Sequence, residues 1–230
     1  MFNPQSYRSS TPRNLLVALA FFITGLTLIA IIYAGVRSNT GLASWDVIVH
    51  DWFVANRTAG MTQFMEFVTF LFDPYLLLGV TALGSVVWAW HKKEYWRPAL
   101  VSLSLAIAFV VSTLIKTIIE RSRPPEADMI LPLETGFAFP SNHTYGVAVL
   151  ALIIGYFLYS RRATVKTFYS WLAGAIICTI LIAASRLYLG YHWLTDVTAS
   201  ICLALVVLAI IMAADRLQTR RFRPQTTEDL

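Results

Sequence analysis

Charged residues are scarce in this sequence: they make up 13% of its 230 residues, where a soluble domain usually has about a quarter. Apolar residues reach 57%, and they are collected into long runs. This combination excludes an ordinary soluble domain and predicts an integral membrane protein. The only two cysteines, Cys178 and Cys202, both lie inside apolar runs, so we expect neither a disulfide nor a metal-binding pair.

Six apolar runs are long enough to cross a bilayer, which takes roughly 20 residues. The predicted spans are Asn14–Val36, Pro74–Trp90, Pro98–Ile119, Thr144–Tyr159, Phe168–Arg186 and Trp193–Ala214. The first is too long for a secretory signal peptide and no cleavage pattern follows it, so we expect a retained helix. The fourth is short and predicts a span whose ends are tucked into protein or solvated by polar groups. The predicted fold class is an all-α, polytopic membrane helical bundle with six transmembrane helices.

The loops differ in their content of basic residues, which are enriched on the cytoplasmic side of membrane proteins. With the N-terminus inside, twelve of the eighteen Lys and Arg residues fall in cytoplasmic segments. This predicts that both termini are cytoplasmic, with tails at 1–13 and 215–230. The net charge of +5 would also suit nucleic-acid binding. Because the positive charge sorts by membrane side, however, we interpret it as a topology anchor near anionic lipid and expect no nucleic-acid partner.

The segment from Ser44 to Gly60, SWDVIVHDWFVANRTAG, differs from the spans. Its large apolar residues recur at helical spacing between polar ones, which predicts an amphipathic helix lying in the outer interface. Asp46 and His50 are four residues apart, a spacing that would suit a metal site. No third ligand is near in sequence, so we expect an ordinary solvated face there.

Ionisable residues within or beside spans are costly in a bilayer and mark functional sites. Here they gather at the ends of four spans: Lys116 and ERSRPP at the end of the third, Ser141, Asn142 and His143 before the fourth, and SRLYLGYHWLTD between the fifth and sixth. In the predicted topology all four ends face outside. The sequence therefore predicts one polar site at the outer membrane face.

Three cations in this site, Lys116, Arg123 and Arg186, predict a polyanionic ligand, because uncompensated like charges repel each other. The planar fork of an arginine matches two oxygens of a phosphate. The start of the fourth span adds free backbone N–H groups, and Ser141 can cap that helix or donate its hydroxyl to an oxyanion. Each residue alone has an ordinary structural interpretation, such as a lysine at the lipid interface. Their coincidence at one face favours an anion-binding site.

His192 and Asp196 are four residues apart, so a helix would place them on one face. A carboxylate at Nδ1 fixes the tautomer of an imidazole and leaves the Nε2 lone pair free as a nucleophile or a base. His143 is a second imidazole, available as a general acid. We expect no metal and no cofactor, since the cations can take the place that magnesium has in many phosphoryl-transfer enzymes.

These residues resemble the type 2 phosphatidic acid phosphatase family, which shares its site with vanadium haloperoxidases. The family motifs K-x6-RP, PSGH and SR-x5-H-x3-D are similar to KTIIERSRP, PSNH and SRLYLGYHWLTD, within a motif core at 116–196. The resemblance implies that His192 attacks phosphorus to form a phosphohistidine, that Asp196 orients it and that His143 protonates the leaving oxygen. It also implies a phosphate-binding set made of Lys116, Arg123, Ser141, Asn142 (through its backbone N–H) and Arg186.

Asn142 stands where the family usually has glycine. Glycine allows a positive φ and a close approach of the backbone to phosphate. Asparagine is the next most tolerant residue at positive φ, so we expect the loop to survive the exchange. The side chain is then expected to narrow the pocket or to add a donor.

The sequence thus predicts an integral membrane lipid phosphatase, a single domain over residues 1–230 in the cell membrane. Its expected partners are the bilayer and a lipid phosphate or diphosphate, from which it removes the terminal phosphate without a metal. An isoprenoid diphosphate such as undecaprenyl diphosphate is the favoured substrate, and phosphatidylglycerophosphate or phosphatidate is the alternative. A lipid phosphotransferase and a non-catalytic lipid-binding protein are the competing interpretations.

Overall fold

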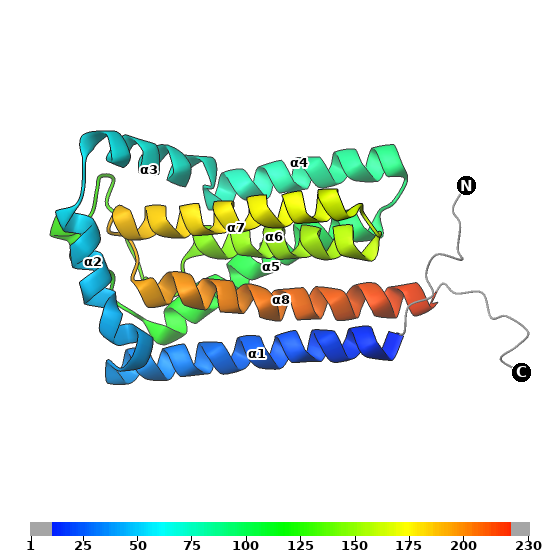
Figure 1. Cartoon of the computed structure of the whole chain (residues 1–230), viewed down its shortest axis with the longest axis horizontal. Helices are drawn as coiled ribbons and strands as arrows, with labels where there is room; N and C mark the ends of the chain where they lie inside the picture. The colour runs from blue at the N-terminus through cyan, green and yellow to red at the C-terminus, as the bar shows by residue number, and fades with distance from the viewer. Residues whose placement is uncertain (1–10, 222–230) are drawn as a thin grey trace, which may run out of the picture.

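The computed structural model describes residues 11–221 as a bundle of long helices (Figure 1). Residues 1–10 and 222–230, which make up most of the predicted cytoplasmic tails, lie outside the described residues. The helices are α1 (Thr11–Ser38), α2 (Asp46–Ala55), α3 (Ala59–Leu71), α4 (Pro74–Lys92), α5 (Trp96–Ile119), α6 (Asn142–Ser160), α7 (Val165–Tyr188) and α8 (Leu194–Arg221). Two short 3₁₀ helices are η2 (Gly41–Trp45) and η3 (Glu126–Asp128). Residues 11–221 contain no strand.

The predicted all-α membrane bundle is confirmed. Five helices are long and apolar enough to cross a membrane by themselves, namely α1, α5, α6, α7 and α8. The second predicted span, Pro74–Trp90, is the longer half of a pair in which α3 and α4 meet at a bend of 45°. The sixth predicted span, Trp193–Ala214, corresponds to α8, which continues as a helix to Arg221.

Local sequence fixes the break between α3 and α4. The carboxylate of Asp73 accepts hydrogen bonds from the backbone N–H groups of Tyr75 (2.9 Å) and Leu76 (3.0 Å). Pro74 suits the first helical position, where a donor would have no partner. The Asp-Pro pair therefore ends one helix and starts the next.

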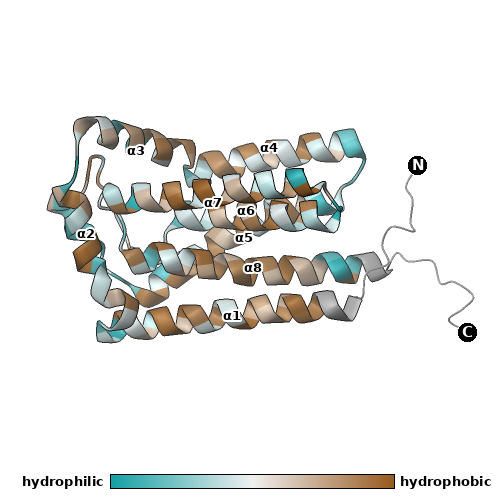
Figure 2. Ribbon diagram, in the orientation of Figure 1, coloured by the Kyte–Doolittle hydropathy of each residue, from teal (hydrophilic) through white to brown (hydrophobic). Residues whose placement is uncertain are grey.

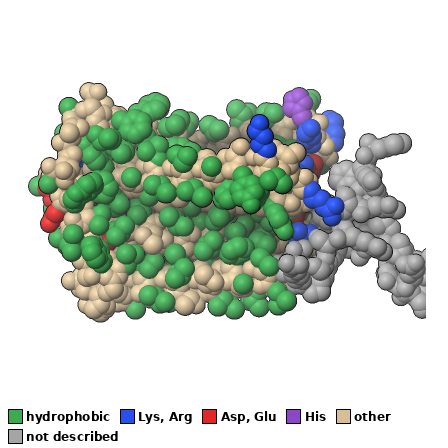
Figure 3. All heavy atoms as spheres, in the orientation of Figure 1, with side chains coloured by type: hydrophobic (Ala, Val, Ile, Leu, Met, Phe, Trp, Pro, Cys, Tyr) green, Lys and Arg blue, Asp and Glu red, His purple; other side chains and the backbone are tan. Residues whose placement is uncertain are grey.

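The core of the bundle surrounds α6, which packs against α5, α7 and α8. Its residues from His143 to Val149 are buried, as the prediction of a short span tucked into protein requires. The outer faces of the bundle carry exposed aliphatic side chains, among them Leu16, Leu83 and Ile177. Figures 2 and 3 show this apolar surface along the length of the bundle, as expected where helices face lipid.

The two ends of the bundle differ in charge. Lys and Arg side chains gather where α4 leads into α5 and α6 into α7 (Figure 3). Helix α2 crosses the opposite end (Figure 1). The predicted spans therefore lie between one basic end and one end covered by a short helix.

The solvated face predicted at Asp46 and His50 is wrong. Both residues are only 4% exposed, whereas Trp45 and Trp52 of the same segment are 56% and 60% exposed. His50 Nε2 lies 3.2 Å from Asp128 Oδ2, and Asp46 contacts the start of α8. Asp46 and His50 can face inward because the loops and helix ends of the bundle provide the partners that buried polar groups need.

Candidate active site

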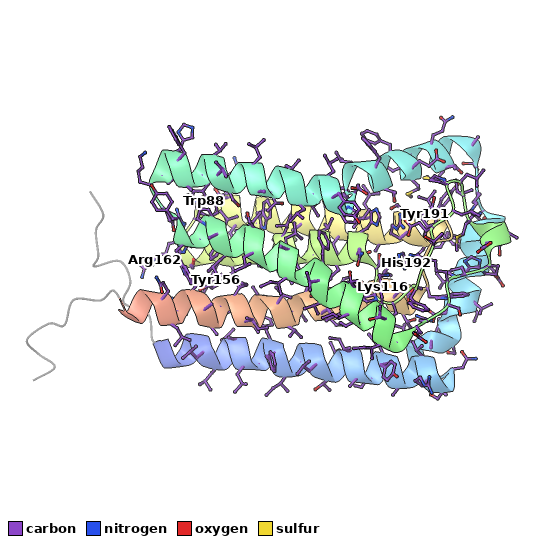
Figure 4. All side chains as sticks on the ribbon, turned by 180° about the vertical axis from the view of Figure 1, so that it is seen from behind. Trp88, Lys116, Tyr156, Arg162, Tyr191 and His192 are labelled. Carbon is purple, nitrogen blue, oxygen red and sulfur yellow. The ribbon has the colours of Figure 1, made fainter. Side chains whose placement is uncertain are left out.

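The site residues predicted from the sequence lie at the end of the bundle that α2 crosses, where Figure 4 labels Lys116, Tyr191 and His192. They come from the last turn of α5, the start of α6, the last turn of α7, the first turn of α8 and the adjoining loops. The four helix ends that the predicted topology brings to one face therefore meet here. The residues are Lys116, Arg123, Ser141, Asn142, His143, Arg186, His192 and Asp196.

His192 is buried in the loop between α7 and α8, and both of its ring nitrogens face charged groups. Nδ1 lies 3.4 Å from Asp196 Oδ2, and the same oxygen accepts the backbone N–H of Trp193 at 2.9 Å. Nε2 lies 3.5 Å from Nη1 of Arg123. Burial, followed by the charges of Arg186 and Arg123, lowers the pKa of His192 well below its ordinary value of 6.5. The imidazole is therefore neutral around neutral pH and carries a lone pair.

Arg123 and Arg186 both contact Tyr191. Arg123 donates to the carbonyl oxygens of Tyr191 (2.7 Å) and Gly136 (3.0 Å). Arg186 is fully buried, donates to the hydroxyl of Thr69 (3.3 Å) and stacks 4.3 Å from the centre of the Tyr191 ring. These contacts hold two guanidinium groups beside His192.

Glu134 bridges the two arginines. Its Oε2 lies 3.1 Å from Arg123 Nη1 in an ion pair, and its Oε1 pairs with Arg186 Nη2. Glu134 lies in the loop between α5 and α6, is 29% exposed and lines a cavity of about 420 Å³ together with Arg123. The sequence analysis missed this carboxylate. Charge balance could have indicated it, because three clustered cations are stabilised by a nearby carboxylate.

Lys116 points into the protein. Its Nζ donates to the carbonyl oxygens of Phe137 (2.7 Å) and Ala138 (3.3 Å) in the loop that enters α6. A lysine ammonium has three donors, so one remains for another acceptor. The Lys116 side chain therefore does not extend to the lipid interface, which was the alternative interpretation of this residue.

Ser141 is fully buried at the N-cap position of α6, yet its side chain caps no backbone N–H. Its hydroxyl oxygen accepts from the hydroxyl of Thr144 at 3.3 Å. Its backbone N–H donates to the hydroxyl of Ser200 on α8 at 2.9 Å. The capping role predicted as one option for Ser141 is therefore wrong, and its own hydroxyl proton can serve another acceptor.

Asn142 is the first residue of α6, and its φ is negative. The expectation that this position needs tolerance of a positive φ is therefore wrong. The side chain turns toward α5, where its Oδ1 accepts a hydrogen bond from the buried hydroxyl of Ser112. Asparagine is accommodated because a neighbouring helix supplies a partner for it.

Gly190 shapes the loop that carries His192. Its φ is +80°, and a Cβ at this position would lie 2.5 Å from the carbonyl oxygen of Asp128 and 3.0 Å from Arg57 Nη2. Only glycine fits such a positive φ and such a close approach of two backbones. The turn from α7 to His192 therefore depends on this residue.

Arg121 and Asp46 were not predicted as site residues, but both contact the start of α8 at this end. The side chain of Arg121 pairs with both Asp46 and Asp196. Within residues 11–221, no group of three or more His, Cys, Asp or Glu side chains is placed to hold a metal ion. The Asp46 and His50 pair instead contacts protein partners, Asp46 through Arg121 and His50 through Asp128.

Known proteins resemble this chain in sequence and structure. The family model of the PAP2 superfamily matches residues 97–220. Phosphatidylglycerophosphatase B of Bacillus subtilis is 28% identical over 202 residues, which are 86% of this chain and 96% of the relative. The crystal structure of a transmembrane PAP2 type phosphatidylglycerolphosphate phosphatase from Bacillus subtilis has a TM-score of 0.76 and 25% identity, over 87% of this chain and 98% of that chain. An undecaprenyl-diphosphatase of Sulfolobus acidocaldarius is 26% identical over 152 residues, 63% of this chain and 66% of the relative.

Proposed function

This chain belongs to the PAP2 superfamily, and from that premise we propose that it hydrolyses the terminal phosphate of a membrane lipid through a phosphohistidine formed on His192. Its membership and its phosphatase relatives make it a membrane lipid phosphatase. The observation that carries the mechanism is the orientation of His192: Nδ1 faces the Asp196 carboxylate, and Nε2 faces Arg123. A nucleophile beside phosphate-binding cations is the arrangement that phosphoryl transfer needs.

In the first step, the Nε2 lone pair of His192 attacks phosphorus, and the bond from phosphorus to the lipid oxygen breaks. His143 gives its proton to that oxygen, so the lipid leaves as an alcohol, or as a monophosphate if the substrate is a diphosphate. Asp196 accepts the Nδ1 proton of His192 in a hydrogen bond and stabilises the positive charge that develops on the ring. The position of His143 supports this assignment, because it is buried in the first turn of α6, directly after Ser141 and Asn142.

In the second step, water attacks phosphorus and gives a proton to the neutral His143. The bond from phosphorus to Nε2 breaks, inorganic phosphate leaves, and both imidazoles return to their starting forms. Atoms and charges balance over the two steps without a further reactant.

Lys116, Arg123 and Arg186 are the proposed ligands of the phosphoryl oxygens. Charge-assisted donors of this kind favour a transition state in which negative charge spreads over those oxygens. The hydroxyl of Ser141 and the backbone N–H of Asn142 add neutral donors at the start of α6, where the helix dipole also favours an anion.

Phosphatidylglycerophosphate is the proposed first substrate, because the Bacillus relative is named a phosphatidylglycerophosphatase and aligns with nearly the whole chain. An isoprenoid diphosphate, which the sequence alone favoured, is the second candidate, and the Sulfolobus relative supports it. Both substrates place a phosphate at the membrane surface on a lipid that stays in the bilayer.

The test is phosphate release from full-length protein in detergent, measured in EDTA over a panel of phosphatidylglycerophosphate, phosphatidate and undecaprenyl diphosphate. We expect His192→Ala to abolish release, because it removes the group that forms the phosphoenzyme. Full activity of that variant would contradict the mechanism. The ranking of kcat/KM over the panel decides the substrate.

We also propose that the site faces outward and that both described helix termini, at the start of α1 and the end of α8, face the cytoplasm. The basic end of the bundle lies opposite the site, and basic residues are enriched on the cytoplasmic side. Intact spheroplasts should then hydrolyse a membrane-impermeant phosphate ester when they express the protein. Hydrolysis that appears only after lysis would reverse the orientation.

A further inference from the structure

Arg121 lies at one of the variable positions of the K-x6-RP motif, two residues before Arg123. Its side chain is only 12% exposed and donates three side-chain hydrogen bonds. Nη1 donates to Asp196 and, at 2.5 Å, to the hydroxyl of Thr195. Nη2 donates to Asp46 Oδ2, also at 2.5 Å. One guanidinium therefore joins the start of α2 to the start of α8.

Asp46 completes this connection from the side of α2. Its Oδ1 accepts the backbone N–H of Thr195 at 2.9 Å, and its Oδ2 accepts the hydroxyl of Thr195 at 2.7 Å. The first N–H groups of a helix have no partner within the helix, and a negative charge there is favourable. Asp46 thus supplies the start of α8 with an acceptor one residue before Asp196.

The two oxygens of Asp196 are held from different sides. Oδ2 faces His192 Nδ1 and the N–H of Trp193, while Oδ1 pairs with Arg121. The carboxylate cannot rotate without losing one of these partners. Arg121 also compensates the charges of Asp46 and Asp196, two buried carboxylates that would otherwise repel each other. The orientation of His192 therefore depends on a chain of contacts that ends on α2.

We propose that Arg121 and Asp46 are positioning residues of the phosphatase, which fix the Asp196 carboxylate and, through it, the direction of His192 Nε2. The inference rests on the proposed function, because it assigns a task to the His192 and Asp196 pair in that reaction. The sequence predicts α2 as an interfacial helix. In this proposal, α2 also helps to position the active-site residues.

The experiment compares Asp46→Asn and Arg121→Gln with the wild type, as full-length proteins in detergent. Asp51→Asn, on the exposed side of α2, and Arg37→Gln, at the exposed end of α1, are the matched charge controls. The assay measures kcat and KM for phosphatidylglycerophosphate and for p-nitrophenyl phosphate, and the inhibition constant of vanadate. The inhibition constant of vanadate measures anion binding by the cations separately from kcat.

We expect kcat to fall on the order of 10²-fold in both variants, the loss typical of a reacting group that is slightly misplaced. KM and the inhibition constant of vanadate should stay at wild-type values, because Lys116, Arg123 and Arg186 are unchanged. Arg121→Lys keeps the charge but lacks the fork that reaches two carboxylates, so its kcat should lie between wild type and Arg121→Gln. The controls should match wild type.

Wild-type kcat in both variants would overturn the inference and leave the phosphatase mechanism standing. A parallel loss of kcat and vanadate binding would also overturn it, since that pattern marks a collapsed site instead of a misaligned nucleophile. Absence of activity in the wild type itself would instead refute the proposed function.

Discussion

Replacing Glu134 by Gln tests how the phosphate-binding cations are held. Glu134 pairs with Arg123 and Arg186, the two guanidinium groups that we propose bind the phosphoryl oxygens. A phosphate must therefore compete with this carboxylate for the same donors. Glutamine keeps the shape and one acceptor but removes the negative charge, so the competition becomes weaker.

The size of the effect follows from these contacts. A hydrogen bond to a charged group contributes about 1.5–3 kcal/mol. Glu134 is 29% exposed, and solvent screening reduces the advantage of the carboxylate over an amide to about 1–2 kcal/mol. Since about 1.4 kcal/mol is a factor of ten in an equilibrium constant, vanadate should bind Glu134→Gln roughly 5- to 30-fold more tightly than wild type.

The assay is the inhibition constant of vanadate against hydrolysis of p-nitrophenyl phosphate at fixed pH and ionic strength. Glu126→Gln is the matched control, because Glu126 lines the same cavity as Glu134 and is exposed. A general change in the electrostatic field would affect both variants alike. Unchanged or weaker vanadate binding in Glu134→Gln would refute the idea that this carboxylate competes with phosphate.

Three further predictions concern pH, the loop before His192 and the start of α6. His192 reacts in its neutral form, and its pKa is lowered from 6.5. The acid limb of the kcat/KM profile should therefore lie below pH 6.5. An acid limb centred above pH 7 would contradict this. Gly190→Ala should abolish activity or folding, because the added Cβ would clash with the carbonyl oxygen of Asp128 and because residue 190 has a φ of +80°. A wild-type melting temperature and kcat would show that the loop accommodates the Cβ. Asn142→Gly should lower the melting temperature, because it leaves the buried Ser112 hydroxyl without its acceptor, at a cost of about 1–3 kcal/mol. Adding Ser112→Ala should recover most of that loss while kcat stays unchanged, and a double variant that melts no higher than the single one would disprove the pairing.

The spans and the meeting of four polar helix ends were predictable because both depend on local sequence. A long run of apolar residues favours the bilayer regardless of which helices pack beside it. The distribution of basic residues among the loops predicts the orientation of the spans. The Asp73-Pro74 pair likewise marks a helix start by itself. The sequence alone did not predict α3 as part of the second span. By itself, α3 is too short for its hydropathy to identify it as membrane-spanning.

Partners chosen by packing were not predictable. Asp46 and His50 looked like a solvated face, since their spacing on α2 says nothing about which side of the helix the bundle covers. Asn142 looked like a substitute for a flexible glycine, until Ser112 on another helix proved to be its partner. In both cases the residue type and its spacing were visible in the sequence, but the element that packs against it was not.

The sequence by itself determined a helical membrane protein, the end of the bundle where its polar groups meet, and the identities of two imidazoles and three cations. Only the tertiary structure decided which charges pair: Glu134 with Arg123 and Arg186, and Arg121 with Asp46 and Asp196. The physical reason is separation along the chain. Hydropathy and helical period act over one or two turns, whereas these ion pairs join residues 11 to 75 positions apart, and only the packing of the helices brings them together.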